Sequence, residues 1–203
     1  MNYILFAGKK VYPSKILCIG RNYVAHIEEL NNDTPSEPVF FMKPNSSISH
    51  EIRSLQDEHI HYEAEISFIV ESNELKGVGF GLDLTKRDVQ DRLKSKGLPW
   101  ERAKAFNNAA VFSEFVTFKG NMRDLRMELY INNRLVQQSG YDLMMNKPDD
   151  ILQEAATFLS FEDGDIIMTG TPKGVGPIHS RDTLIGKIFE KETLIVEGCW
   201  VVK

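Results

Sequence analysis

The sequence predicts an α+β protein that is mostly β, with a mixed or antiparallel sheet and helices to one side of it. Apolar strand-like runs outnumber helical patterns, and Gly, Asn or Pro turns separate several of them. Strands and helices do not alternate regularly, which disfavours a βαβ architecture. The chain has 203 residues, enough to bury a full core, so we expect a single domain over residues 1–203.

Apolar runs rich in β-branched and aromatic residues are expected to form the strands. In chain order they are KILCIG (15–20), PVFFMK (38–43), AEISFIV (64–70), VGFGLDL (78–84), VFSEFVTF (111–118), LRMELYI (125–131), DIIMTG (165–170) and TLIVEGCWVV (193–202).

Helical patterns are fewer. In the first segment Asn22 is the expected N-cap, and in the second Thr85 is the expected cap and Gly97 the exit. The third has an apolar stripe along one side. The three predicted helices cover residues 22–30, 85–97 and 148–161.

Composition and charge limit the partners. A net charge of -5, without a basic stripe, argues against nucleic-acid binding. The longest early apolar run is too short for a signal peptide or a membrane span, so we expect a cytoplasmic protein. Cys18 and Cys199 lie in apolar strand-like runs without a CxxC neighbour, which predicts two buried free thiols.

The stretch HIHYEAEISFIV, residues 59–70, places Glu63 and Glu65 in an otherwise buried strand. Side chains alternate along a strand, so both carboxylates share one face, about 6.6 Å apart at the backbone. Asp83 follows, where a strand runs into a predicted helix. Three carboxylates suit a hard cation such as Mg²⁺ or Mn²⁺. A solvent-exposed strand face and an ordinary turn aspartate are the alternatives.

A second metal hypothesis uses overlapping residues. His59, His61 and Glu65 have an HxH-x₃-E spacing like that of the first cupin motif, which suits Fe, Mn or Zn. Arg53 and Ser72 stand where glycines are expected, and no second histidine motif of that kind follows. These departures weaken the cupin interpretation.

Two further motifs carry possible chemistry. His26 and Glu29 are spaced i, i+3 on a predicted helix, where a carboxylate can poise an imidazole as a general base. The Gly-rich stretch TGTPKGVGP (169–177) can offer backbone N–H groups to an anion, with Thr169, Thr171 and Lys173 as added donors. A surface pair and a structural loop are the alternatives. Arg87, Gln90 and Lys104 are ordinary surface residues by default, and they suggest a function only if they lie close to these motifs.

Taken in order, GRNYVAHIEEL, SEPVFFMKP, HYEAEI, LDLTKRDVQ, KGLPWERAKAF and GDIIMTGTPKGVGP resemble the fumarylacetoacetate hydrolase family. The likeness is to its short, single-domain acylpyruvase and oxaloacetate decarboxylase branch, and it runs from about residue 15 to the C-terminus. The resemblance implies a mostly β, mixed-sheet roll with a few short helices, usually dimeric. We therefore expect a homodimer that acts on a small 2-oxo acid.

The resemblance also implies roles for individual residues. Glu63, Glu65 and Asp83 would bind Mg²⁺ or Mn²⁺. One face of the strand that carries Glu63 and Glu65 would then be core and the other active site. The remaining implied roles are a water-activating dyad of His26 and Glu29, a catalytic Lys104, and substrate contacts from Arg21, Arg87, Gln90 and Thr171.

The implied reaction is metal-assisted hydrolysis of a carbon–carbon bond in a 2,4-dioxo acid, through a metal-bound pyruvate enolate. Oxaloacetate decarboxylation or tautomerisation passes through the same enolate without hydrolytic water. Isomerisation of unsaturated 2-oxo dicarboxylates from aromatic catabolism and non-catalytic binding of 2-oxo acids are further alternatives.

Two stretches depart from the family pattern. The segment 71–80 is short, so a helix there is expected to be trimmed or missing. Asn107, Asn108 and Val111 replace the residues expected after Lys104, and they would alter substrate choice if they line the pocket.

Overall fold

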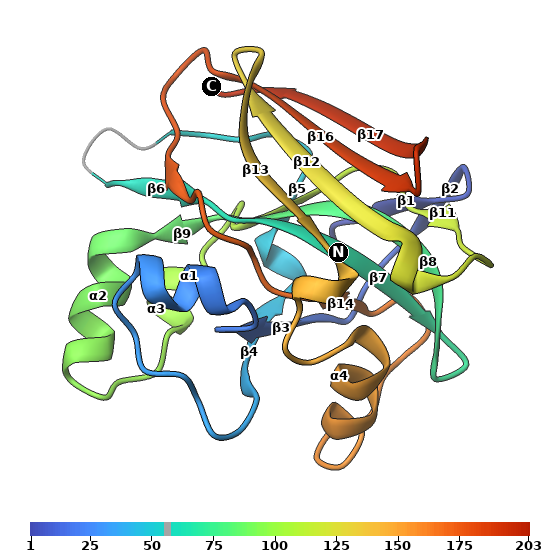
Figure 1. Cartoon of the computed structure of the whole chain (residues 1–203), viewed down its shortest axis with the longest axis horizontal. Helices are drawn as coiled ribbons and strands as arrows, with labels where there is room; N and C mark the ends of the chain where they lie inside the picture. Colours follow the sequence, from blue (N-terminus) through green and yellow to red (C-terminus); the bar gives the residue numbers. More distant parts are fainter. Residues whose placement is uncertain (55–57) are drawn as a thin grey trace.

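An eight-stranded mixed sheet forms the centre of the computed structural model, which describes residues 1–54 and 58–203 (Figure 1). Its path runs β4-β3-β14-β7-β8-β10-β5, and β11 also pairs with β8. The pairs β3–β14 and β5–β10 are parallel. The bounds are β3 Lys15–Gly20, β4 Val39–Pro44, β5 Ile48–Ser49, β7 Ala64–Glu71, β8 Glu74–Asp83, β10 Ala110–Phe112, β11 Val116–Thr117 and β14 Ile166–Met168.

A four-stranded antiparallel sheet lies across one face of this central sheet, and the helices lie on the opposite face of the central sheet (Figure 1). Its order is β13-β12-β16-β17, with bounds Arg134–Gly140, Leu125–Ile131, Thr183–Glu190 and Thr193–Val201. A three-stranded sheet joins β15 (Gly176–Pro177), β6 (Ile60–Tyr62) and β9 (Thr85–Lys86), and β1 (Ile4–Phe6) pairs with β2 (Lys9–Val11). The predicted mixed, mostly β α+β fold is confirmed.

All three predicted helices form, and each is shorter than expected. The helices are α1 Val24–Glu29, α2 Arg87–Ser95, α3 Glu101–Lys104 and α4 Pro148–Ala155, with single 3₁₀ turns at η1 Asn45–Ser47, η2 Met122–Asp124 and η3 Tyr141–Leu143. The short α3 was not predicted. Among the described residues, no helix has the length and apolar character needed to cross a membrane.

The predicted helix caps are wrong because tertiary contacts recruit the capping residues. Asn22 donates from Nδ2 to the carbonyl of Thr169 over 2.9 Å instead of capping α1, whose N-cap is Tyr23. Thr85 lies in β9, and Lys86 takes the cap position of α2. Gly97 does follow the end of α2 with a φ of +61°.

The largest core fills the space between the two main sheets. Its buried side chains come from β7 and β8 on one side and from β12, β16 and β17 on the other. Cys18 is buried as predicted, but Cys199 is exposed, so that prediction is wrong. The cause is its position on an edge strand, where Cys199 shares the outward face with the exposed Glu197.

The turn between β7 and β8 replaces the helix that was expected to be trimmed or missing. Ser72 and Asn73 have φ values of 52° and 57° and close a tight hairpin in which Glu71 pairs with Glu74. A register shift between Ile69 and Val70 lies in β7, just before this turn. Beyond this irregularity the register stays constant up to the carboxylates.

Gly186→Ala is expected to lower the free energy of unfolding by about 1–3 kcal/mol, because it overpacks the core. A Cβ at Gly186 would lie 2.3 Å from Cε1 of Phe80, a fully buried side chain of the central sheet. Urea denaturation measures the effect. Lys187→Ala, on the same strand, is the control, and an equal loss of stability in both variants would contradict this reason.

Candidate active site

Three buried carboxylates meet at one end of the β7–β8 hairpin. Glu63, Glu65 and Asp83 each offer an oxygen that lies within 4.8 Å of the others, and their exposed fractions are 5%, 1% and 0%. The structure therefore brings together the three residues that the sequence predicts as metal ligands.

The hairpin register explains this convergence. Ala64 pairs with Leu82 and Glu65 with Gly81, which places Glu63 directly opposite Asp83, whose amide donates to the Glu63 carbonyl over 2.8 Å. Residues directly opposite each other in an antiparallel pair share a face. Gly81 leaves the position opposite Glu65 without a side chain.

Lys104 is the cation at the centre of the cluster. Its Nζ donates to Glu63 Oε2 and Asp83 Oδ2, both over 2.7 Å, and to Thr85 Oγ1 over 2.6 Å. Burial lowers the pKa of Lys104, but Asp83 and Glu63 outweigh it and raise the pKa above its ordinary value. Lys104 therefore stays an ammonium group at neutral pH.

Lys43 is a second buried cation, which the sequence analysis missed. It is fully buried, its Nζ lies 2.7 Å from Asp83 Oδ1, and it donates to the backbone carbonyl of Lys104. Lys43 thus holds the Asp83 carboxylate and the backbone of Lys104 close together. The available signal was a lysine at the end of the apolar run PVFFMK.

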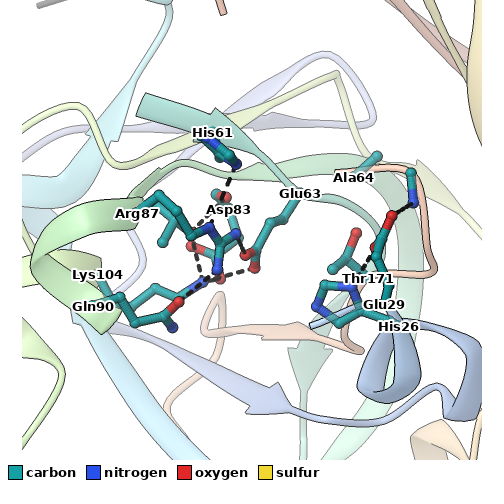
Figure 2. A network of polar contacts seen from close by, with 12 residues as sticks. His26, Glu29, His61, Glu63, Ala64, Asp83, Arg87, Gln90, Lys104 and Thr171 are labelled. Atoms are coloured by element: carbon teal, nitrogen blue, oxygen red, sulfur yellow. Dashed lines mark hydrogen bonds and ion pairs between the residues drawn. The ribbon is translucent and has the colours of Figure 1, made fainter. Parts of the chain in front are cut away.

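Arg87 and Gln90 flank the carboxylates from α2. Arg87 pairs with Glu63 and donates from Nη1 to Gln90 Oε1 over 2.6 Å, so the two residues act as one unit. Figure 2 shows Glu63 between this group and Lys104 on one side and His26 with Glu29 on the other.

The pKa values of Glu63 and Glu65 are shifted in opposite directions. Burial raises the pKa of Glu63, but Lys104 and Arg87 outweigh it and hold that pKa well below its usual range. Burial raises the pKa of Glu65 well above its usual value, and the charges of Asp83 and Glu63 add to the effect. The raised pKa of Glu65 therefore favours its protonated form, whereas Glu63 stays ionised beside Lys104 and Arg87.

This donor set fits a divalent cation. All three ligands offer oxygen, as Mg²⁺ and Mn²⁺ prefer. The buried Asp83 Oδ1 accepts no hydrogen bond from the described residues, because Lys43 approaches it outside hydrogen-bonding geometry. A cation would satisfy that oxygen and lower the pKa of Glu65.

The predicted His26–Glu29 pair is present on α1. His26 Nδ1 lies 3.2 Å from Glu29 Oε2, and Glu29 Oε1 accepts the Gly174 amide over 2.9 Å. Burial lowers the pKa of His26, which favours the neutral ring at pH 7. Because a neutral imidazole donates through one nitrogen, the bond to Glu29 leaves Nε2 as an acceptor.

The TGTPKGVGP loop binds the protein's own carboxylates. The Gly170 amide donates to Glu65 Oε2 over 2.6 Å, and the Gly174 amide donates to Glu29. Gly170 has a φ of +90°, and a Cβ there would lie 2.9 Å from the Cβ of Asn22. The loop therefore positions two site residues, which corrects its interpretation as an open anion cradle.

Thr171 lines the site but Lys173 does not. Thr171 Oγ1 accepts from Gln137 Nε2 over 2.9 Å, and Gln137 Oε1 accepts the Ala64 amide over 3.0 Å. The side chain of Lys173 is exposed and lines a different hollow. Gln137, on β13, is a positioning residue without a sequence signal, because its partners are distant in the chain.

Nine of the ten residues predicted for the site line one cavity. The tenth, Glu29, does not line it but contacts His26, which does. The cavity lining also includes Lys94, Trp100 and Asn32, which were not predicted. Asn107, Asn108 and Val111 are absent from this lining, and Val111 belongs to the main core. The departures in that segment therefore do not act through direct contact in this cavity.

The cupin interpretation is wrong. His59 is exposed and pairs with Asp88 over 2.9 Å, and His61 accepts from Arg87 Nε over 3.4 Å. Neither histidine joins the carboxylate cluster found among the described residues.

A family model described as the fumarylacetoacetate (FAA) hydrolase C-terminal part matches residues 15–197. The chain belongs to the fumarylacetoacetate hydrolase family. The match covers the carboxylates, the dyad and the Gly-rich loop in one stretch. The sequence-based assignment to this family is therefore confirmed.

Relatives in the fumarylacetoacetate hydrolase family match over nearly the whole chain. The mitochondrial oxaloacetate tautomerase of Saccharomyces cerevisiae is 36% identical over 232 residues, with 90% of each chain covered. A solved structure from Oleispira antarctica, described as a fumarylacetoacetate isomerase/hydrolase, has a TM-score of 0.93, 35% identity and full coverage of both chains.

A second solved structure is that of fumarylpyruvate hydrolase from Pseudomonas aeruginosa, in complex with Mn²⁺ and pyruvate. Its TM-score is 0.88 and its identity 25%, over 100% of this chain and 96% of that one. Relatives of this chain thus include both a tautomerase and a hydrolase.

Proposed function

We propose that this chain is a divalent-metal-dependent enzyme that interconverts the keto and enol forms of oxaloacetate. The observation that carries the proposal is the buried cluster of Glu63, Glu65 and Asp83 beside the charged Lys104. The similarity to oxaloacetate tautomerase over 90% of the chain supports the choice of reaction.

The three carboxylates would hold Mg²⁺ or Mn²⁺, and the metal would supply Lewis-acid polarisation of the substrate's oxygens. The protein's own groups share the remaining work. The Lys104 ammonium group favours negative charge on the 2-oxo oxygen as the enolate develops. Arg87 and Gln90 line the same cavity and orient the substrate. Burial of these groups strengthens each interaction, since little water competes.

Proton transfer at C3 falls to His26. Its ring lines the cavity, its pKa is lowered by burial, and its Nε2 is left as an acceptor by the bond to Glu29. A neutral imidazole at this position can take the C3 proton and leave an enolate. The imidazolium can then give that proton to the enolate oxygen, which yields the enol, or return it to C3, which restores the keto form.

A second candidate function is hydrolysis of acylpyruvates or fumarylacetoacetate-like 2,4-dioxo acids. The His26–Glu29 pair favours it, because the same neutral imidazole can take a proton from an attacking water. The P. aeruginosa fumarylpyruvate hydrolase has the same fold. We infer that both reactions would use one cavity.

A substrate panel separates these functions. With Mg²⁺ or Mn²⁺ we expect the ultraviolet signal of enol-oxaloacetate to decay faster than the spontaneous rate, and EDTA to remove the acceleration. Acetylpyruvate and fumarylpyruvate, followed by pyruvate release, report hydrolysis. No acceleration for any 2-oxo acid with either metal would refute catalysis and leave a 2-oxo acid binder.

A further inference from the structure

Two cations outside the carboxylate cluster line the outer part of the same cavity. They are Arg21, which follows β3, and Lys94, near the end of α2. Both side chains are half-buried, and neither contacts Glu63, Glu65 or Asp83 within ion-pair distance. They therefore offer positive charge that is not paired directly with a carboxylate of the cluster.

Arg21 is held in a conformation that suits a ligand. Its φ of 57° is unusual for a residue with a side chain and costs energy that the surrounding structure must offset. Its Nε is buried and has no acceptor among the described residues. A different nitrogen of the same guanidinium, Nη1, donates a 3.4 Å hydrogen bond to the Asp33 carbonyl. A buried guanidinium donor without an acceptor favours an anion at this position.

Lys94 lies on the face of α2 that is turned toward the cavity. Arg87, Gln90 and Lys94 follow at spacings of three and four residues, and all three line the cavity. Lys94 lies about 10.5 Å along the helix axis from Arg87, which is bound to Glu63. The three residues thus run from the carboxylate cluster outward, and Lys94 marks the outer end.

The charges around Lys94 leave it short of a partner. Burial lowers the pKa of Lys94, and the charges of Arg21 and Arg87 lower it further. The charges of Asp91 and Glu63 oppose these effects. Within the described chain no carboxylate lies within 4.0 Å of Lys94 Nζ. Two half-buried cations that repel each other are stabilised by an anion between them.

We propose that Lys94 and Arg21 bind the distal carboxylate of a 2-oxo dicarboxylate and so determine the substrate class. The inference rests on the proposed function, which places the 2-oxo end of the substrate at the carboxylate cluster. A dicarboxylate offers a second carboxylate to the two cations that line this cavity, whereas a neutral acyl group leaves them unpaired. Selection for charge at the distal end follows, since unpaired buried groups penalise the wrong ligand.

The test compares two ligands that differ in the distal carboxylate. Difluorooxaloacetate carries no hydrogen on C3 and cannot enolise, so the proposed tautomerisation cannot consume it; pyruvate lacks the second carboxylate. Calorimetry with Mg²⁺ should show tighter binding of difluorooxaloacetate by the unmodified protein. In Lys94→Gln its affinity should fall about tenfold, as for loss of one charge-assisted hydrogen bond, while pyruvate affinity stays unchanged. Arg21→Gln should behave in the same way.

Lys96→Gln is the matched control, because Lys96 is exposed at the end of the same helix and does not line the cavity. It should alter neither affinity. Equal weakening of both ligands in Lys94→Gln, or no weakening, would overturn the proposal. Lys94-dependent binding without oxaloacetate turnover would refute the proposed reaction and leave the carboxylate site standing. Absence of binding by the unmodified protein would refute both.

Discussion

Asp83→Asn is expected to abolish metal-dependent activity and to destabilise the fold by about 3–5 kcal/mol. The activity loss follows from removing one of the three proposed ligands of the cation. The stability loss follows from Lys43, which is fully buried and has Asp83 as its carboxylate partner over 2.7 Å. Turnover with Mg²⁺ and metal binding by calorimetry measure the first effect, and urea denaturation in EDTA measures the second.

Glu65→Gln separates the loss of metal from the loss of stability. The raised pKa of Glu65 means that a neutral side chain is tolerated in the metal-free protein, so this variant should fold normally but bind metal weakly. Asp88→Asn, an exposed carboxylate on α2, is the control and should leave metal binding and turnover intact. Metal-dependent turnover in Asp83→Asn at the unmodified rate would disprove the assignment of this cluster.

His26→Ala is expected to reduce tautomerisation and hydrolysis by about 10²–10⁴-fold, the usual contribution of a general base. Both reactions require a proton to be taken, from C3 or from water. Decarboxylation of oxaloacetate breaks the bond to CO₂ without a prior proton transfer. It should therefore persist in the variant, as far as the unmodified protein catalyses it, and CO₂ release measured beside enol decay tests the difference.

Glu29→Gln provides the matched comparison for His26→Ala. The amide keeps a hydrogen-bond acceptor for His26 Nδ1 but removes the charge, so the rates should fall less than in His26→Ala. Equal loss of decarboxylation and hydrolysis in His26→Ala would argue against this division of labour and for a structural role of the ring.

Local patterns carry much of the fold. KILCIG and LRMELYI coincide with β3 and β12 because each is a short apolar run bounded by turn or polar residues. The hairpin strands β13 and β16 were missed, since polar residues interrupt their apolar pattern. Helix ends were misplaced where distant partners compete for the capping side chain, as Thr169 does for Asn22.

The candidate site likewise contains residues that the sequence predicts and residues that it does not. The predicted ligands and the dyad lie in short motifs whose spacing along the chain is informative. Lys43 and Gln137 carry no such motif, because their partners lie far away in the sequence. Lys94 resembles any surface lysine until the fold turns its face of α2 toward the cavity.

The sequence by itself determined the family and the alternation that places Glu63 and Glu65 on one face, because both follow from local spacing. The tertiary structure decided whether Asp83 joins them. The tight turn at Ser72 and Asn73, together with the irregularity after Ile69, sets the register that places Asp83 opposite Glu63. A slip of one residue would turn Asp83 to the other face, since side chains alternate with a period of two. Long-range pairing fixes that register, and the local spacing of the carboxylates carries no information about it.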